Sequence, residues 1–139
     1  MPISNAHVER VVADVSSGAS DPNHVAMVVG EMMRRQPAIG HYVQGHSREL
    51  SLEGSVIVLL HAAVLLRCVE VERGRTLRVL DFRALDAATR VPGALAEEPA
   101  LASYVDSNVT SDDPLIGGGR QKTARAVLDV IARALLLSS

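Results

Sequence analysis

The hydrophobic pattern contains one segment that is apolar on every side. Between residues 56 and 66 every side chain is apolar except that of His61. A membrane-spanning helix needs about 20 apolar residues, so this shorter run is not expected to span a membrane. A buried strand would be about 4 to 8 residues long and rich in β-branched types, which describes only the start of the run. The pattern therefore predicts a central core helix over residues 52–67, capped by Ser51 and covered on all sides.

Other segments carry a single apolar face at helical spacing. In the first of them, four valines recur at i, i+3, i+4 and i+7, namely Val8, Val11, Val12 and Val15. Asp21 and Pro22 form a favourable start for the second, because an Asp caps well and a Pro is tolerated in the first turn. Helices are expected over residues 4–16, 22–35, 37–50, 82–89, 99–108 and 120–137. Ser4 or Asn5 can cap the first of these helices, Asp81 caps the helix over residues 82–89, and Pro99 lies near the start of the helix over residues 99–108. The fold class is therefore a mainly α, single-domain bundle over residues 1–139, with about six helices around the central one.

The period of the pattern is ambiguous between residues 68 and 79. β-Branched residues are frequent there and favour strands, namely Val69, Val71, Thr76 and Val79. Arg73-Gly74 suits a two-residue turn, so a short β-hairpin over residues 68–79 is the favoured interpretation. The alternative is that the central helix runs on to Glu72 and ends at Gly74.

A glycine-rich segment precedes the last helix. Residues 110–119, TSDDPLIGGG, end in three glycines and predict a flexible hinge. The following helix, residues 120–137, is strongly amphipathic, and its polar face carries charges at i, i+4 spacing, namely Arg125, Asp129 and Arg133. This helix is too short to fold alone. It can lie either in its own domain or in the groove of a partner.

Charge and cysteine content restrict the function classes. The formal net charge of −2 is weak evidence against a nucleic-acid-binding protein, which usually has a basic face. The single cysteine, Cys68, cannot form an internal disulfide, which fits a reducing cytoplasm. The first residues show no signal-peptide pattern, and Lys122 is the only lysine against thirteen arginines, which indicates a GC-rich, bacterial genome. We expect a cytoplasmic bacterial protein.

The core must be built from small aliphatic side chains. Hydrophobic residues make up 47% of the chain, yet only three residues are aromatic, namely Tyr42, Phe82 and Tyr104. More apolar surface than one small core can hide suggests a partner surface. We therefore expect a homodimer or another oligomer.

Two histidines are the most interesting polar residues of the pattern. His46 and His61 fall on faces that are expected to be buried, on helices joined by a tight turn. A pair of buried imidazoles can bind a metal, transfer protons or sense pH, with Cys68 as a further candidate ligand. A buried histidine is more often an ordinary hydrogen-bonded core residue. No standard metal-ligand spacing is present, so no metal and no cofactor is predicted.

A second candidate site lies at the start of the last helix. A glycine-rich loop entering a helix exposes backbone N–H groups to anions, and cationic side chains follow it. The candidate residues are Gly118, Gly119, Arg120 and Lys122. The P-loop pattern is absent, because a P-loop requires GxxxxGK[ST] after a strand. The other basic region, which includes Arg75, Arg78 and Arg83, is interleaved with acidic residues and reads as a mixed, solvated face.

The sequence shows no catalytic constellation, which leans against an enzyme. The favoured function is a non-enzymatic protein–protein interaction or regulatory module that self-associates. Candidate interface residues are Met27, Met32, Met33, Val127, Leu128, Ile131 and Leu135. The first alternative is a small-ligand or metal-binding protein using His46 and His61. The second is a nucleic-acid-binding regulator using Arg120, Lys122 and Arg125.

Overall fold

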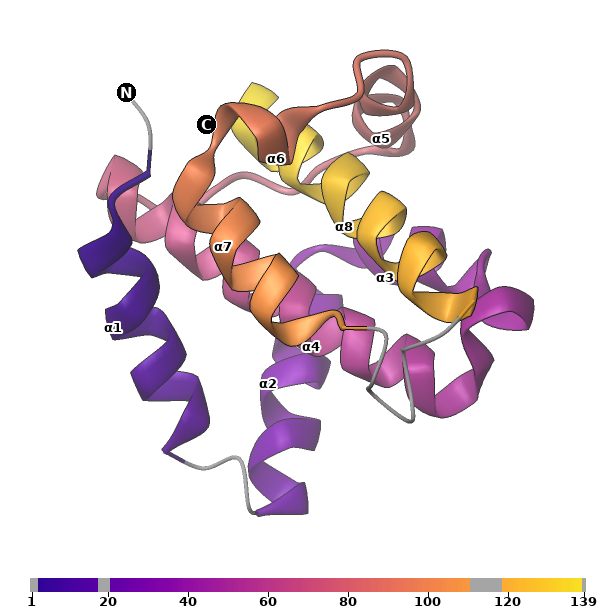
Figure 1. Ribbon diagram of the computed structural model, residues 1–139, viewed down its shortest axis with the longest axis horizontal. Coiled ribbons are helices and arrows are strands. Elements are labelled where there is room, and N and C mark those ends of the chain that lie inside the picture. The colour runs from indigo at the N-terminus through magenta and orange to yellow at the C-terminus, as the bar shows by residue number, and fades with distance from the viewer. Residues whose placement is uncertain (1–2, 18–20, 111–118, 139) are drawn as a thin grey trace.

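The computed structural model describes residues 3–17, 21–110 and 119–138. Over these residues the chain forms eight helices and no strand (Figure 1). The helices are α1 (Asn5–Ser16), α2 (Pro22–Arg35), α3 (Pro37–Gln44), α4 (Ser47–Arg73), α5 (Phe82–Thr89), α6 (Ala94–Glu97), α7 (Pro99–Asn108) and α8 (Gly119–Leu137). The prediction of a mainly α helical bundle is confirmed.

Helix α4 is the centre of the bundle, as the apolar run predicted. It contacts α1, α2, α3 and α8, and α8 in turn contacts α5 and α6 (Figure 1). Val58, Ala62 and Leu65 of α4 are fully buried. Ser51 interrupts the helix with a φ of 68°, and its hydroxyl accepts a 3.1 Å hydrogen bond from the backbone N–H of Gly54. Ser51 is therefore a cap inside α4, and the long apolar part of the helix follows it.

By length and composition alone, α4 would be long and apolar enough to cross a membrane. Within the protein, 67% of its most apolar stretch is buried by the surrounding helices. A helix that is hydrophobic all round and covered by neighbours is also typical of a protein core.

The predicted hairpin over residues 68–79 is wrong, and the alternative is confirmed. Residues 68–73 continue α4, and Gly74 ends the helix in the left-handed conformation with a φ of 68°. Cys68 and Val69 are fully buried among the other helices. Packing of this face therefore outweighs the modest strand preference of the β-branched residues. Residues 75–81 then form an extended connection without strand pairing.

Helix α8 is docked within its own chain. Its apolar stripe is almost fully buried, namely Val127 at 1% and Leu128, Ile131 and Leu135 at 0% exposure. The predicted i, i+4 pairs on its other face do not form. Asp129 instead accepts hydrogen bonds of 3.0 Å from the backbone N–H groups of Gly93 and Leu95. Polar side chains of α8 thus hold the connection around α6, a short helix that the sequence pattern did not predict.

Most predicted helix boundaries are confirmed by their caps. The side chains of Ser4, Asp21 and Asp81 each accept a backbone N–H at the start of α1, α2 and α5. Pro99 begins α7 as expected. Of the predicted hinge over residues 110–119, residues 111–118 lie outside the described residues.

Candidate functional site

A wide groove runs between α3 and α5. Its volume is about 480 Å³. It is lined by residues of α3 and the following turn and by residues of α5, namely His41, Tyr42, Gly45, His46, Phe82, Arg83, Leu85, Asp86 and Thr89. Two of the three aromatic residues of the chain therefore meet at one hollow of the surface.

Local sequence explains why these side chains point outward. In α3, Ile39 and Val43 are fully buried, which leaves His41 exposed on the opposite side. In α5, the carboxylate of Asp81 caps the helix, while Leu85 and Ala88 face the core. Phe82, the first residue of α5, is consequently left 62% exposed.

Ring contacts order the walls of the groove. The rings of His41 and Phe82 lie edge to face with centroids 5.7 Å apart, which links α3 to α5. The rings of Tyr42 and His46 also lie edge to face, with centroids 5.1 Å apart. Partial burial raises the pKa of Tyr42 above its ordinary value. Such edge-to-face pairs favour a fixed ring orientation, so the groove presents preorganised aromatic surface.

Charges of both signs surround the rings. Asp86 lies 3.6 Å from Arg90 in an exposed i, i+4 pair, and His46 lies 3.0 Å from Glu49. Within the described residues Arg83 has no ion pair. The groove is therefore apolar at its walls and carries an available cation and an exposed carboxylate at its rim.

The two histidines selected from the sequence do not share a site. The predicted helix over residues 37–50 ends at Gln44, and His46 precedes α4 instead, which leaves its side chain one-third exposed. His61 is 8% exposed in α4, and its Nδ1 lies 2.7 Å from the hydroxyl of Tyr104 in α7. His46 thus lines the α3–α5 groove, whereas His61 pairs with α7.

Cys68 lies in the core near Tyr104, the partner of His61. It is fully buried, and burial raises the pKa of its thiol to about 12. Burial, and secondarily the nearby Cys68, raises the pKa of Tyr104 above its ordinary value. A protonated, buried thiol is a poor nucleophile and a poor metal ligand. Across the described ranges, no group of three or more His, Cys, Asp or Glu side chains is placed to hold a metal ion.

The other predicted site residues are dispersed. Arg120 and Lys122 are exposed near the start of α8, which begins at Gly119, and Gly118 lies outside the described residues. Arg125 lies 3.2 Å from Asp106 in an ion pair, so part of its charge is already neutralised.

The three predicted interface methionines of α2 are divided between the core and the surface. Met32 is 3% exposed and Met33 is half-buried, whereas Met27 is 62% exposed. The four predicted interface residues of α8 are buried inside the chain. A partner would reach them only if α8 left the bundle.

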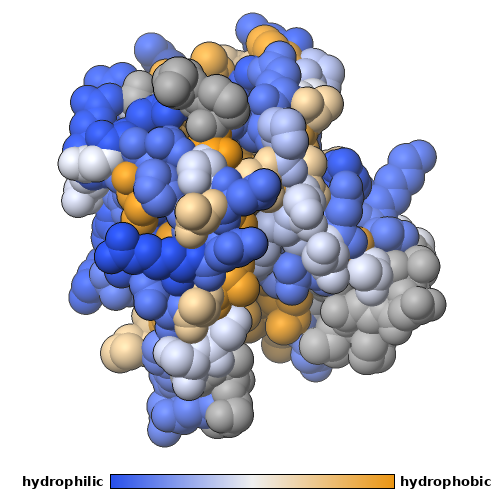
Figure 2. All heavy atoms as spheres, turned by 60° about the vertical axis from the view of Figure 1, so that its left-hand side comes forward, coloured by the Kyte–Doolittle hydropathy of each residue, from blue (hydrophilic) through white to orange (hydrophobic). Residues whose placement is uncertain are grey.

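Much of the surface is hydrophilic. The face on which α1 lies shows mainly hydrophilic residues, with hydrophobic atoms in small separate groups (Figure 2). Among the described residues the large exposed hydrophobic side chains are Met27, Leu52, Val56, Val79, Phe82, Val91 and Leu137. Of these, Phe82 is the one that lines the α3–α5 groove.

Comparisons of the chain with protein-family models, with curated proteins and with solved structures find no match.

Sequence reasoning missed the groove as a unit. Phe82 and His41 were not selected, because neither belongs to a motif. The available signal was positional, since the expected cap at Asp81 places the next residue at the first helical position, where it tends to face solvent.

Proposed function

We propose that this protein is a non-enzymatic interaction module that self-associates as a symmetric dimer through the α3–α5 groove. The observation that supports this proposal is the exposure of Phe82, at 62%, on the rim of a groove walled by three further rings. Aromatic and arginine side chains are enriched at protein–protein interfaces and often dominate their binding energy. The ring of one copy would enter the groove of the other.

The charges at the rim favour a second copy as the partner. In a two-fold symmetric dimer, residue i of one copy meets residue j of the other, and j meets i. Arg83 and Asp86 lie in the same groove with opposite signs. A two-fold axis through the groove would bring each against its opposite on the partner, which gives two ion pairs from one self-complementary patch.

The test is sedimentation of the full chain from about 1 μM to about 1 mM, a range that covers weak and moderate affinities. We expect a concentration-dependent dimer, and we expect Phe82→Ala to weaken it by at least about 30-fold, the effect of a hot-spot truncation. Leu52→Ala, at a residue that is 77% exposed and outside the groove, is the matched control and should leave the dimer unchanged. A monomer at about 1 mM, or equal effects of the two variants, would overturn the proposal.

A charge exchange tests the symmetry itself. Arg83→Asp alone places like charges opposite each other and should weaken the dimer, because like-charge contacts are unfavourable at an interface. The double variant Arg83→Asp/Asp86→Arg restores opposite charges across the axis and should recover the affinity. Failure of the double variant to recover would exclude this arrangement of the two copies.

A further inference from the structure

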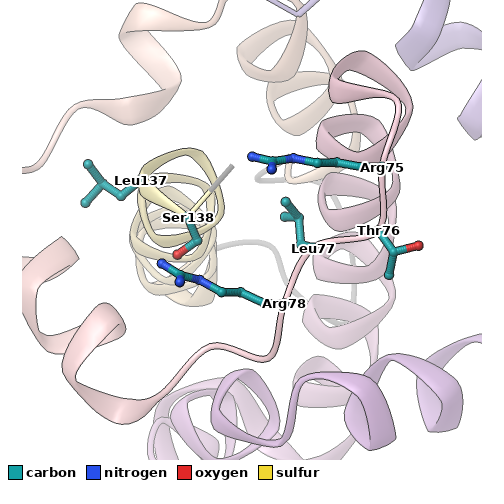
Figure 3. Close-up of a pocket in the computed structure, with 6 residues that line it drawn as sticks. All are labelled: Arg75, Thr76, Leu77, Arg78, Leu137 and Ser138. Carbon is teal, nitrogen blue, oxygen red and sulfur yellow. The ribbon is translucent and has the colours of Figure 1, made fainter.

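A second hollow, separate from the α3–α5 groove, lies where the connection after α4 passes the end of α8 (Figure 3). Its volume is about 360 Å³, which is within the range of small-molecule sites. It is lined by Arg75, Thr76, Leu77, Arg78, Leu137 and Ser138. The guanidinium groups of Arg75 and Arg78 both extend from the connection toward α8 (Figure 3).

The backbone that carries these arginines is held by buried polar side chains. The amide of Gln36, which is fully buried, donates a 2.9 Å hydrogen bond to the carbonyl of Arg78 and accepts one of 2.8 Å from the N–H of Leu80. The N–H of Leu77 donates to Glu70 at 2.8 Å. Because the segment is already fixed, a ligand would not have to order it, and preorganisation of this kind improves affinity.

Nearby carboxylates are occupied by other groups. Glu70 pairs with Arg35 and accepts the N–H of Leu77. Glu72 accepts the N–H of Ser4. As a result, neither arginine of the hollow forms an ion pair within the described residues.

Two uncompensated cations therefore face one small space. The hollow lies at the carboxyl end of α8, where the helix dipole contributes about −0.5 charge. Two guanidinium groups outweigh this partial charge, so the hollow remains positive.

The chemistry of the lining indicates the class of anion. A guanidinium binds an oxyanion through two parallel N–H donors, and two of them suit a group with three terminal oxygens and close to two negative charges. A phosphate monoester meets both conditions, whereas a carboxylate has two oxygens and one charge. Of the other lining residues, Leu77 lies between the two arginines and Ser138 lies on the side of Arg78, whereas the side chains of Thr76 and Leu137 point away from this space (Figure 3).

We propose that Arg75 and Arg78 form a binding site for a small phosphorylated metabolite. The two guanidinium groups bind the phosphate, and Leu77 and Ser138, which lie beside them, contact the body of the ligand. The site needs no second copy of the chain, so it does not depend on the proposed dimer.

The test is titration of the full chain with glucose 6-phosphate, with inorganic phosphate and with glucose, followed by calorimetry and by amide chemical shifts at low salt. We expect saturable binding of the two phosphates, no binding of glucose, and shifts confined to residues 75–78 and 137–138. Arg75→Gln and Arg78→Gln should each weaken binding at least tenfold, the usual effect of losing a charge-assisted hydrogen bond. Arg78→Lys should recover only part of the affinity, because lysine lacks the two-pronged geometry.

The double variant Arg34→Gln/Arg48→Gln is the matched control. It removes the same charge as Arg75→Gln/Arg78→Gln, but from exposed positions on α2 and α4, and it should retain binding within about twofold. Unchanged melting temperatures without ligand will show that each variant is folded. Absence of binding at about 10 mM phosphate monoester, equal losses in the two double variants, or shifts centred on Arg120 and Lys122 would each overturn the proposal.

Discussion

Two irregular connections flank α5, and arginine side chains have opposite roles in them. Residues 74–81 are fixed by Gln36, between α2 and α3, and by Glu70 of α4, and their own arginines are exposed. Residues 90–98 are fixed by α8. There Asp129 accepts two backbone N–H groups, and the guanidinium of Arg133 donates to the carbonyl of Val91 and pairs with Glu97.

The difference separates a scaffold from a candidate binding surface. Buried polar backbone must find partners, and both connections meet this requirement through side chains of the surrounding bundle. Arg133 of α8, which holds residues 90–98, is 9% exposed, and its Nε and one terminal nitrogen have partners inside the chain, whereas its other terminal nitrogen is buried without a hydrogen-bond partner among the described residues. The backbone of residues 74–81 is hydrogen-bonded by the amide of Gln36 and the carboxylate of Glu70. Arg75 and Arg78 therefore remain available to an external anion.

The largest effect on stability is expected when the hydrogen bonds from Gln36 to residues 74–81, called here the Gln36 clamp, are removed. Gln36→Leu keeps a side chain of similar size but removes the partners of the Arg78 carbonyl and the Leu80 N–H. Leaving a buried polar group unpaired costs about 1–3 kcal/mol, so we expect the free energy of unfolding to fall by about 2–4 kcal/mol in urea denaturation. Phosphate binding should weaken in the same variant, because the backbone of Arg78 is released.

Gln44→Leu is the control for this change. Gln44 is the exposed last residue of α3, and exposed substitutions usually alter stability by less than about 0.5 kcal/mol. A similar loss in both variants would show that the Gln36 hydrogen bonds do not hold the connection.

A smaller loss of stability is expected when the hydrogen bonds from Asp129 to residues 90–98, called here the Asp129 clamp, are removed. Asp129→Ala leaves the N–H groups of Gly93 and Leu95 without their acceptor, but these groups are only partly buried. We therefore expect a loss of about 1–2 kcal/mol, with Asp129→Asn losing less because its amide oxygen still accepts.

Asp106→Ala removes a carboxylate of the exposed ion pair with Arg125 and should cost about 0–1 kcal/mol. Phosphate binding should be unchanged in the Asp129 variants, since the two connections are held independently. A loss of binding there would mean that the comparison between the two connections fails.

The sequence predicted the features that depend on local chemistry. Asp21 and Asp81 were identified as caps, and Ser4 as one of two candidates with Asn5, because a short polar side chain before an apolar period satisfies free N–H groups. The central helix was identified from its apolar run.

The rest depends on contacts between distant parts of the chain. Residues 68–73 were assigned to a strand because burial that overrides β preference cannot be seen locally. Asp129 was placed in a surface ion pair because the N–H groups that it accepts lie more than 30 residues away. For the same reason, the sequence showed Arg75 and Arg78 among neighbouring acids, but not that those acids are occupied.

The smallest effect is expected from a third tether at the end of α4. Glu72 lies two residues after Glu70, and it holds the amino-terminal segment instead of residues 74–81. Its carboxylate accepts the N–H of Ser4 at 2.7 Å and lies 3.1 Å from the ring of His7. The backbone hydrogen bond from Ser4, and then the contacts with His7, lower the pKa of Glu72 below its ordinary value.

A lowered folded-state pKa fixes the sign of the pH dependence. The ionised form of Glu72 stabilises the fold above the unfolded-state pKa of about 4.3, and this contribution is lost as the pH falls through the lower folded-state pKa. Glu72→Gln retains an acceptor for Ser4 and removes only the charge, so the difference in unfolding free energy between wild type and variant should be constant near pH 7 and shrink below about pH 4. Urea denaturation from pH 7 to pH 3 measures it, with Glu53→Gln as the control for removing an exposed acidic charge from α4. A difference that stays the same from pH 7 to pH 3 would show that the Glu72 charge does not hold the amino-terminal segment. Stability would then depend on the polar contacts of residues 74–81 and 90–98 alone.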